Sequence, residues 1–105
     1  MKVIPCWLYV CICDALVGKI YPEIRVIAVR YTRKRELLIR YYLDRDVTDE
    51  DINRANEVME YILENISSKD DITHYESECI YTKDKLGDID TLDERIYARC
   101  EDDFY

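Results

Sequence analysis

The sequence contains one histidine, His74, followed at alternate positions by Glu76 and Glu78. Alternate residues of a β-strand share one face, so a strand here would set an imidazole beside two carboxylates. Such groups could orient one another for the acid–base chemistry of a nuclease. A hydrolase also needs a nucleophile that converges on the base, and a lone strand histidine more often has a structural or surface role. We therefore predict no catalytic residues and keep a His74-dependent hydrolase as an alternative.

A cluster of carboxylates between residues 44 and 51 could in principle hold Mg²⁺ or Ca²⁺. Its members are Asp44, Asp46, Asp49, Glu50 and Asp51. The cluster lacks the spaced oxygen ligands and the glycine of a calcium loop. Acidic residues at the start of a helix are also stabilised by the helix dipole, which explains half of the cluster without a metal. The sequence has no glycine-rich phosphate loop either, and we predict neither a metal nor a cofactor.

The five cysteines form an odd set without C-x-x-C spacing: Cys6, Cys11, Cys13, Cys79 and Cys100. Such a set suits free thiols in a reducing cytoplasm better than a disulfide framework. On a helix, Cys11 and Cys13 would point about 200° apart, so core packing explains them better than a zinc site does. If any pair does form, Cys79 and Cys100 are the first candidates, because they lie on separate predicted strands that could be neighbours in the sheet.

The charge of the chain is segregated along its length. Residues 1–45 carry nine Lys or Arg against four Asp or Glu, residues 46–68 carry one against seven, and residues 69–105 carry five against twelve. The total of −8 repels phosphates, so we predict no direct binding to nucleic acid or to an anionic membrane. Ten tyrosines add rings that are common both in strands and at protein interfaces. An acidic surface with exposed tyrosines would suit a basic protein partner.

The first 44 residues divide into a helix and two strands. Residues 5–20 are apolar, with Pro5 at the start and Gly18 near the end, which predicts a buried helix. The stretch is too short to span a bilayer and lacks a convincing signal-peptide cleavage site. Residues 23–32 and 36–44 both alternate, and the short polar link between them predicts an antiparallel hairpin.

The clearest element is a helix from Thr48 to about Asn65. Thr48 is a favourable N-cap, and Asp51 stands three residues further on, as in a capping box. Apolar residues at three- and four-residue spacing predict an inward stripe: Ile52, Ala55, Met59, Ile62 and Ile66. Polar residues about 160° away around the helix predict its outward face: Asn53, Glu57, Glu60 and Glu64.

Residues 72–82 and 93–100 alternate as two further strands, which gives the order α-β-β-α-β-β. With two hairpin-like pairs and two helices, we predict an α+β fold: a four-stranded antiparallel sheet with both helices packed on one face. The chain has 105 residues, no internal repeat and no linker, so residues 1–105 are expected to form a single domain.

The stretch ALVGKIYPEIRVIAVRYTRKRELLIRYYLDRDVTDEDINRANEVMEYILEN resembles a family of small bacterial immunity proteins, including those linked to contact-dependent growth inhibition toxins. In this pattern a helix ends in a short hydrophobic segment with glycine, a Pro-x-hydrophobic-Arg strand follows, and a second strand leads to an acid-capped helix. The matching positions are Ala15, Leu16, Gly18, Pro22, Ile24, Arg25, residues 39–44 and residues 48–51. The similarity is close over residues 8–66 and loose over the last strands, which here end acidic.

The resemblance implies a cytoplasmic, non-enzymatic inhibitor that binds the C-terminal toxic domain of its cognate toxin. We expect a nuclease toxin, because nucleases carry basic clefts for phosphate. The candidate partner-binding residues are the acids and tyrosines of the last 50 residues: Glu57, Glu60, Tyr61, Glu64, Glu76, Glu78, Tyr97, Asp102, Asp103 and Tyr105. The free protein would be a monomer or a homodimer. A small structural or regulatory module that dimerises through tyrosine-rich edge strands is the alternative from another class.

Overall fold

The computed structural model describes residues 4–101. Its helices and strands are α1 (Cys6–Leu16), β1 (Ile24–Tyr31), β2 (Glu36–Leu43), α2 (Asp49–Asn65), β3 (His74–Tyr81) and β4 (Glu94–Ala98). Short 3₁₀ turns at Lys69–Asp71 and Leu86–Asp88 precede β3 and β4. The predicted order α-β-β-α-β-β is confirmed. Within this range, neither helix combines the length and the apolar character needed to cross a membrane.

The sheet is mixed, with the strand order β3-β2-β1-β4. β1 pairs antiparallel with β2 and with β4, whereas β2 and β3 run parallel. The prediction of a wholly antiparallel sheet is therefore wrong, and the length of α2 explains why. The seventeen residues of α2 span about 25 Å, nearly the length of the eight-residue β2, so the helix returns the chain to the start of β2. β3 then sets out in the same direction as β2, as in a strand–helix–strand unit.

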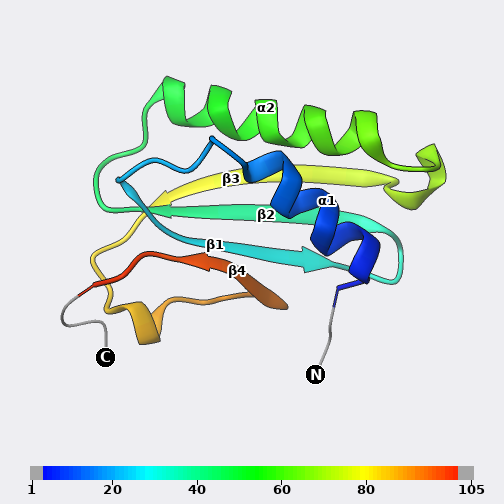
Figure 1. The fold of residues 1–105 in the computed structure, drawn as a ribbon. Coiled ribbons are helices and arrows are strands. Elements are labelled where there is room, and N and C mark those ends of the chain that lie inside the picture. Colours follow the sequence, from blue (N-terminus) through cyan, green and yellow to red (C-terminus); the bar gives the residue numbers. More distant parts are fainter. Residues whose placement is uncertain (1–3, 102–105) are drawn as a thin grey trace.

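Both helices pack on one face of the sheet (Figure 1). Leu8 and Ile12 of α1 meet Ile62 of α2 and the inward residues Ile27 and Ile39 of the sheet, and all five are fully buried. At about 25 cal/mol per Å² of buried apolar area, this contiguous cluster is the main stabilising contribution to the fold. It also holds α2 against β2 and β3.

The opposite face of the sheet is covered in part by residues 82–93. β3 and β4 lie at opposite edges and run the same way, so this connection has to cross the sheet. On the way, Leu86 and Ile89 pack on Val26, Ala28 and Tyr42 in a second apolar cluster. The face beyond this crossing is left open around the β1–β2 turn.

Helix α1 is buried along one face only, which corrects the prediction of a buried helix. Leu8, Ile12, Ala15 and Leu16 face the core. The outward face is also apolar, and Val17 just after the helix is 77% exposed. Because apolar residues line the helix all round apart from the exposed Asp14, the sequence carried no polar stripe to show which side faces the solvent.

Helix α2 begins at the predicted cap. The Thr48 side chain accepts a hydrogen bond from the Asp51 N–H, and the Asp51 carboxylate accepts one from the Thr48 N–H, which completes the capping box. Ala55, Met59 and Ile62 are buried as predicted, whereas Ile66 follows the helix and is half-buried. Ile52 is 47% exposed and does not belong to the inward stripe. The inward position of the first turn is occupied instead by Asp51.

Substitutions can separate the contribution of the α2 cap from that of its inward stripe. Ile62→Ala should lower the free energy of unfolding by about 2–5 kcal/mol, because it leaves a cavity in the core. Thr48→Ala should cost about 1 kcal/mol through loss of the cap. Urea unfolding monitored by circular dichroism measures both losses. Ile52→Ala is the matched control and should change the stability by less than about 0.5 kcal/mol; equal losses for Ile52→Ala and Ile62→Ala would contradict the observed orientation of the helix.

Candidate partner-binding surface

The outward side of α2 carries the predicted acidic residues. Glu57, Glu60 and Glu64 are all exposed, and Tyr61 beside them is 42% exposed. Glu57 pairs with Lys19 Nζ at 3.2 Å. Within residues 4–101, Glu60 and Glu64 form no ion pair, so their charges face the solvent uncompensated. Helical spacing thus presents three carboxylates and one ring on a single face.

The acidic side of α2 continues onto the edge of the sheet at β3. Glu60 of α2 and the β3 residues Tyr75 and Glu76 line one groove of about 260 Å³, which also includes the apolar side chains of Met59 and Leu63. Tyr75 is 56% exposed. We call the surface formed by Glu57, Glu60, Tyr61, Glu64, Tyr75 and Glu76 the acidic face. Tyr75 was not among the predicted contacts, although its place between His74 and Glu76 on an alternating strand pointed to it.

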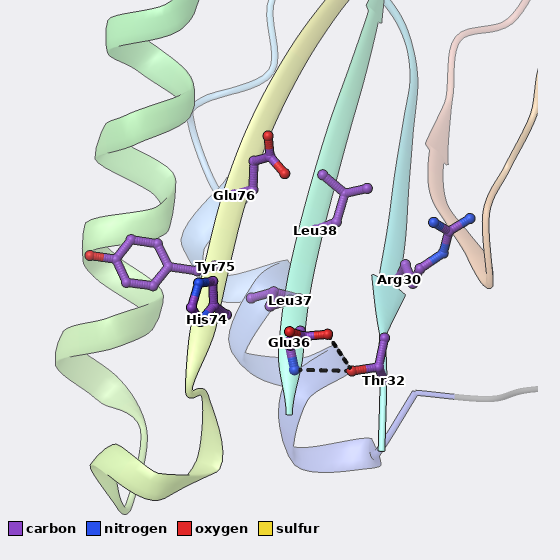
Figure 2. Close-up of a pocket in the computed structure, with 8 residues that line it drawn as sticks. All are labelled: Arg30, Thr32, Glu36, Leu37, Leu38, His74, Tyr75 and Glu76. Atoms are coloured by element: carbon purple, nitrogen blue, oxygen red, sulfur yellow. Dashed lines mark hydrogen bonds between the residues drawn. The ribbon is translucent and has the colours of Figure 1, made fainter. Parts of the chain in front are cut away.

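A larger groove of about 570 Å³ lies on the open face of the sheet (Figure 2). Its charged and titratable side chains are Arg30, Glu36, His74 and Glu76, and Leu38 lies between them. Tyr75 points the other way, toward α2. The two grooves therefore flank β3 on its two sides, and Glu76 lines both.

The residues proposed for the hydrolase alternative lie on one face of β3 but do not form a catalytic arrangement among the described residues. His74 is exposed, and no hydrogen bond links its imidazole to a carboxylate in residues 4–101. Glu78 accepts a hydrogen bond from Arg40 Nε at 2.8 Å, and its side chain is 30% exposed. The carboxylate of Glu78 is thus already paired within the chain.

Tyr97 lies on β4, at the opposite edge of the sheet from Glu76. It packs against the main core and lines a groove of about 340 Å³ with Cys13, Val17 and Ile20. A bulge in the pairing of β4 with β1 places Tyr97 beside Ile27, and so breaks the simple alternation expected for residues 93–100. The predicted contacts Asp102, Asp103 and Tyr105 lie outside the described residues. The structure therefore brings together the candidates of α2 with Glu76, and leaves Tyr97 apart.

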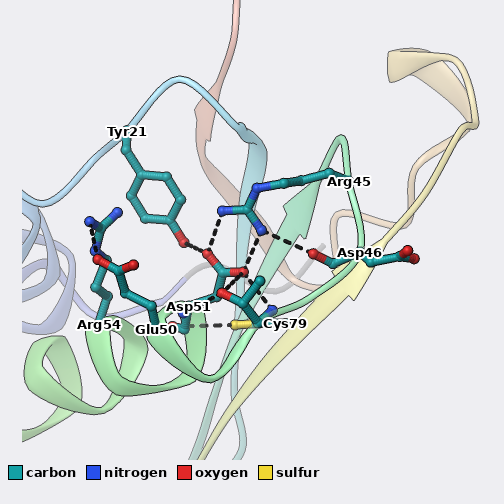
Figure 3. Close-up of polar contacts among 8 residues, drawn as sticks. Tyr21, Arg45, Asp46, Glu50, Asp51, Arg54 and Cys79 are labelled. Carbon is teal, nitrogen blue, oxygen red and sulfur yellow. Dashed lines mark hydrogen bonds and ion pairs between the residues drawn. The ribbon is translucent and has the colours of Figure 1, made fainter.

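The N-terminal end of α2 is fixed by the buried carboxylate of Asp51 (Figure 3). Arg45 donates to both carboxylate oxygens at 2.7 and 3.0 Å, and the Tyr21 hydroxyl donates at 2.7 Å. The Arg45 guanidinium, helped by Tyr21 and Thr48, holds the pKa of Asp51 well below its usual range, against the opposing effect of burial. Cys79 of β3 contacts the Asp51 carbonyl at 3.8 Å. One carboxylate thus links α2 to the segments before β1 and after β2.

A second ionic network holds the chain after β4. The buried Arg25 donates to both carboxylate oxygens of Glu101 at 2.9 and 2.8 Å, and to the carbonyl of Thr82 at 3.1 Å. Arg99 donates to Asp44 at 2.6 Å. Arg25 lowers the pKa of Glu101, because its guanidinium stabilises the charged carboxylate. Two residues of the immunity-protein pattern, Arg25 and Asp44, therefore have structural roles here.

The acidic cluster at residues 44–51 is dispersed among these contacts. Asp44 pairs with Arg99, Asp51 with Arg45, and Glu50 with Arg54. Within residues 4–101, no three His, Cys, Asp or Glu side chains gather in a way that could hold a metal ion.

All five cysteines are free thiols in the structure. Cys79 and Cys100 cannot pair, because β3 and β4 lie at opposite edges of the sheet. The idea that they lie on neighbouring strands is therefore wrong. Burial raises the pKa of Cys79 to about 11, with a smaller contribution from Asp51. The Cys79 thiol is thus protonated and unreactive at neutral pH.

The acidic face combines exposed carboxylates with the exposed rings of Tyr61 and Tyr75, and tyrosine is enriched at protein interfaces. The comparison with protein families agrees with this. The family model described as MafI2 immunity protein matches residues 5–101, nearly the whole chain, so the chain belongs to the MafI2 immunity protein family. A search of curated proteins finds no match.

Membership of this family confirms the resemblance to small bacterial immunity proteins. It implies that the partner of the chain is a toxin protein. The link to contact-dependent growth inhibition stays a prediction.

The Asp51 network makes folding stability depend on pH in a defined direction. Because the folded-state pKa of Asp51 is depressed, its contribution is complete above the unfolded value of about 3.9 and is lost as the pH falls below it. Asp51→Asn should lower the free energy of unfolding by about 1.5–3 kcal/mol at pH 7. The difference from wild type should shrink between pH 5 and pH 2.5, measured by urea unfolding. Asp84→Asn, at an exposed position, is the control; a constant difference for Asp51→Asn at every pH would contradict the assignment.

Proposed function

We propose that this immunity protein neutralises a nuclease toxin through its acidic face. The observation that carries the proposal is the uncompensated charge of Glu60 and Glu64 beside the exposed rings of Tyr61 and Tyr75. A nuclease cleft is lined by Lys and Arg that bind phosphates, so an array of carboxylates can occupy it or lie beside it. Exposed tyrosines add anchors of large area at low entropic cost.

The distribution of charge supports rapid capture of such a toxin. The basic residues of the chain lie mostly in residues 1–45, whereas the acidic face is built from residues 57–76. A basic toxin would therefore be steered toward one side of the molecule before contact. Charged groups around an interface act mainly on the association rate, whereas buried anchors act on the dissociation rate.

The role of charge is tested with the triple change Glu57→Gln, Glu60→Gln and Glu64→Gln, which keeps side-chain size and helix propensity. Where the adjacent reading frame encodes a toxin domain, association with that domain should slow by roughly tenfold at low ionic strength. The difference should shrink near 1 M salt, where the Debye length is about 3 Å. Stopped-flow or surface plasmon resonance measures both rates.

The matched control removes the same amount of charge elsewhere, by Asp46→Asn, Asp84→Asn and Asp88→Asn at exposed positions. It should slow association much less than the glutamate triple. Equal slowing would mean that net charge, and not the acidic face, directs the encounter. Tyr61→Ala should instead raise the dissociation rate at every salt concentration, and Tyr97→Ala tests whether the toxin also reaches β4. Wild-type protein that fails to bind this toxin domain would overturn the proposed function.

A second candidate function, self-association, is favoured by the outward face of α1. Trp7 and Val10 are 42% and 51% exposed, and Val17 and Ile20 continue the patch toward the groove beside Tyr97. Asp14 is the single charged residue between Cys6 and Val17. Contiguous exposed apolar surface of this kind marks an interaction site. In a chain of charge −8, two copies meet most easily where the charge is nearly absent. This candidate uses α1 and not the edge strands.

Val17→Lys tests this candidate, because it adds charge at the most exposed position of the patch without touching the core. Wild-type protein should show a mass that rises with concentration in sedimentation equilibrium, and Val17→Lys should remain monomeric. Ile52→Lys, on the exposed side of α2, is the control and should associate like wild type. A wild-type mass equal to that of a monomer at all concentrations would reject self-association.

A further inference from the structure

The outer edge of β3 is a strand edge without a partner strand among residues 4–101. The Thr32 N–H donates to the Glu36 carbonyl at 3.1 Å, so even-numbered residues of β2 bond toward β1 and odd-numbered ones toward β3. In agreement, the Leu43 carbonyl accepts from the Thr82 N–H at 3.1 Å, at the far end of the β2–β3 ladder. The bond from Thr73 to the Arg35 carbonyl lies before β3 begins and does not belong to this ladder.

The direction of these bonds decides which residues of β3 present free backbone groups. In a parallel ladder, alternate residues direct both backbone groups to the same neighbour. The Thr82 N–H points toward β2, so the alternate residues before it, including Glu78 and Glu76, also point their backbone groups toward β2. The residues between them, including Tyr75 and Ser77, point theirs outward. The free edge is therefore offered by the residues whose side chains face α2.

Grooves flank this edge on both faces of the sheet. The groove of about 260 Å³ lies between β3 and α2, and the groove of about 570 Å³ lies on the open face. Tyr75 and Glu76 line both grooves, and Figure 2 shows them beside the one on the open face. A chain that paired with β3 would send its side chains alternately to the two faces, and so into the two grooves. The first has an apolar floor of Met59 and Leu63 beside the charge of Glu60.

Charge decides which chain fits this edge. If two copies paired antiparallel about Ser77, Glu76 of one would lie opposite Glu78 of the other. Like charges directly opposite each other destabilise strand pairing. Lys or Arg side chains on an added strand would meet Glu76 on the open face and Glu60 on the helix face. Pairing of two copies in this register is therefore disfavoured, even though Arg40 partly compensates Glu78, whereas a basic extended segment meets complementary charge.

We propose that an extended segment of the toxin, with Lys or Arg among its residues, adds to the edge of β3 as a fifth strand. This inference rests on the proposed function and specifies how the acidic face would hold its partner. Backbone hydrogen bonds to Tyr75 and Ser77 provide the register, and the two grooves provide specificity for alternate side chains. The acidic residues then attract the toxin, and in the register centred on Ser77 they disfavour pairing with another copy of the chain.

Residue-resolved amide hydrogen exchange, measured by NMR on the full chain, tests the alternation directly. The probe is a catalytically inactive variant of the toxin domain encoded in the adjacent reading frame. In the free protein the amides of Glu76 and Glu78 should be protected, and those of Tyr75 and Ser77 should exchange fast. Binding should slow exchange at Tyr75 and Ser77 by tenfold or more. A stable complex without slowing at these two amides overturns the strand addition and leaves the proposed function standing, whereas failure to form a complex removes both.

A matched pair of substitutions at one position gives the second test. Tyr75→Ala removes the exposed ring and keeps the outward N–H. Tyr75→Pro removes the ring and the N–H, at an edge position where proline costs no bond to β2. Tyr75→Pro should weaken toxin binding about tenfold more than Tyr75→Ala, measured by titration calorimetry. Equal affinities would overturn the proposal. If circular dichroism shows that Tyr75→Pro does not fold, the exchange experiment on the unmodified chain decides alone.

Discussion

The buried carboxylate of Asp51 is the contact on which the arrangement of the acidic face depends. A charge removed from water is tolerated only when it is paired and hydrogen-bonded, and Asp51 meets both conditions through Arg45, Tyr21 and Thr48. These partners come from the segments before β1 and after β2 and from the cap of α2. The carboxylate therefore fixes where α2 starts and how it is rotated. That rotation turns Glu60 outward and Ile62 inward.

The rigid placement of α2 has a direct effect on the sheet. Because α2 spans the length of β2, it brings the chain back to the end of the sheet where β2 starts. The next strand, β3, then runs parallel to β2 and lies at the edge of the sheet. The same helix lies along that edge and supplies Glu60 beside Tyr75 and Glu76. The acidic face is thus one helix and one strand held in register by the core. A wholly antiparallel sheet would have separated these residues.

Local rules in the sequence were enough to predict the elements but not their pairing. Thr48 and Asp51 indicated the helix cap, and alternation indicated the faces of β3, with Glu76 opposite Tyr75. Pairing depends on contacts distant in sequence, and β4 joins β1 across about 70 residues, which no local pattern encodes. The exposed side of α1 was missed because its residues are apolar all round. The position of Tyr97 was missed because a bulge shifts the alternation of β4.

The strand order also has a consequence for the synthesis of the protein. Every residue of the acidic face lies before position 82, whereas β4 and Glu101, which pairs with Arg25, come later in the chain. Chains are made from the N-terminus, and β1, β2, α2 and β3 already form a contiguous layer of helix on sheet. The acidic face is therefore synthesised before β4. β4 pairs at the opposite edge of the sheet, at a distance from the acidic face.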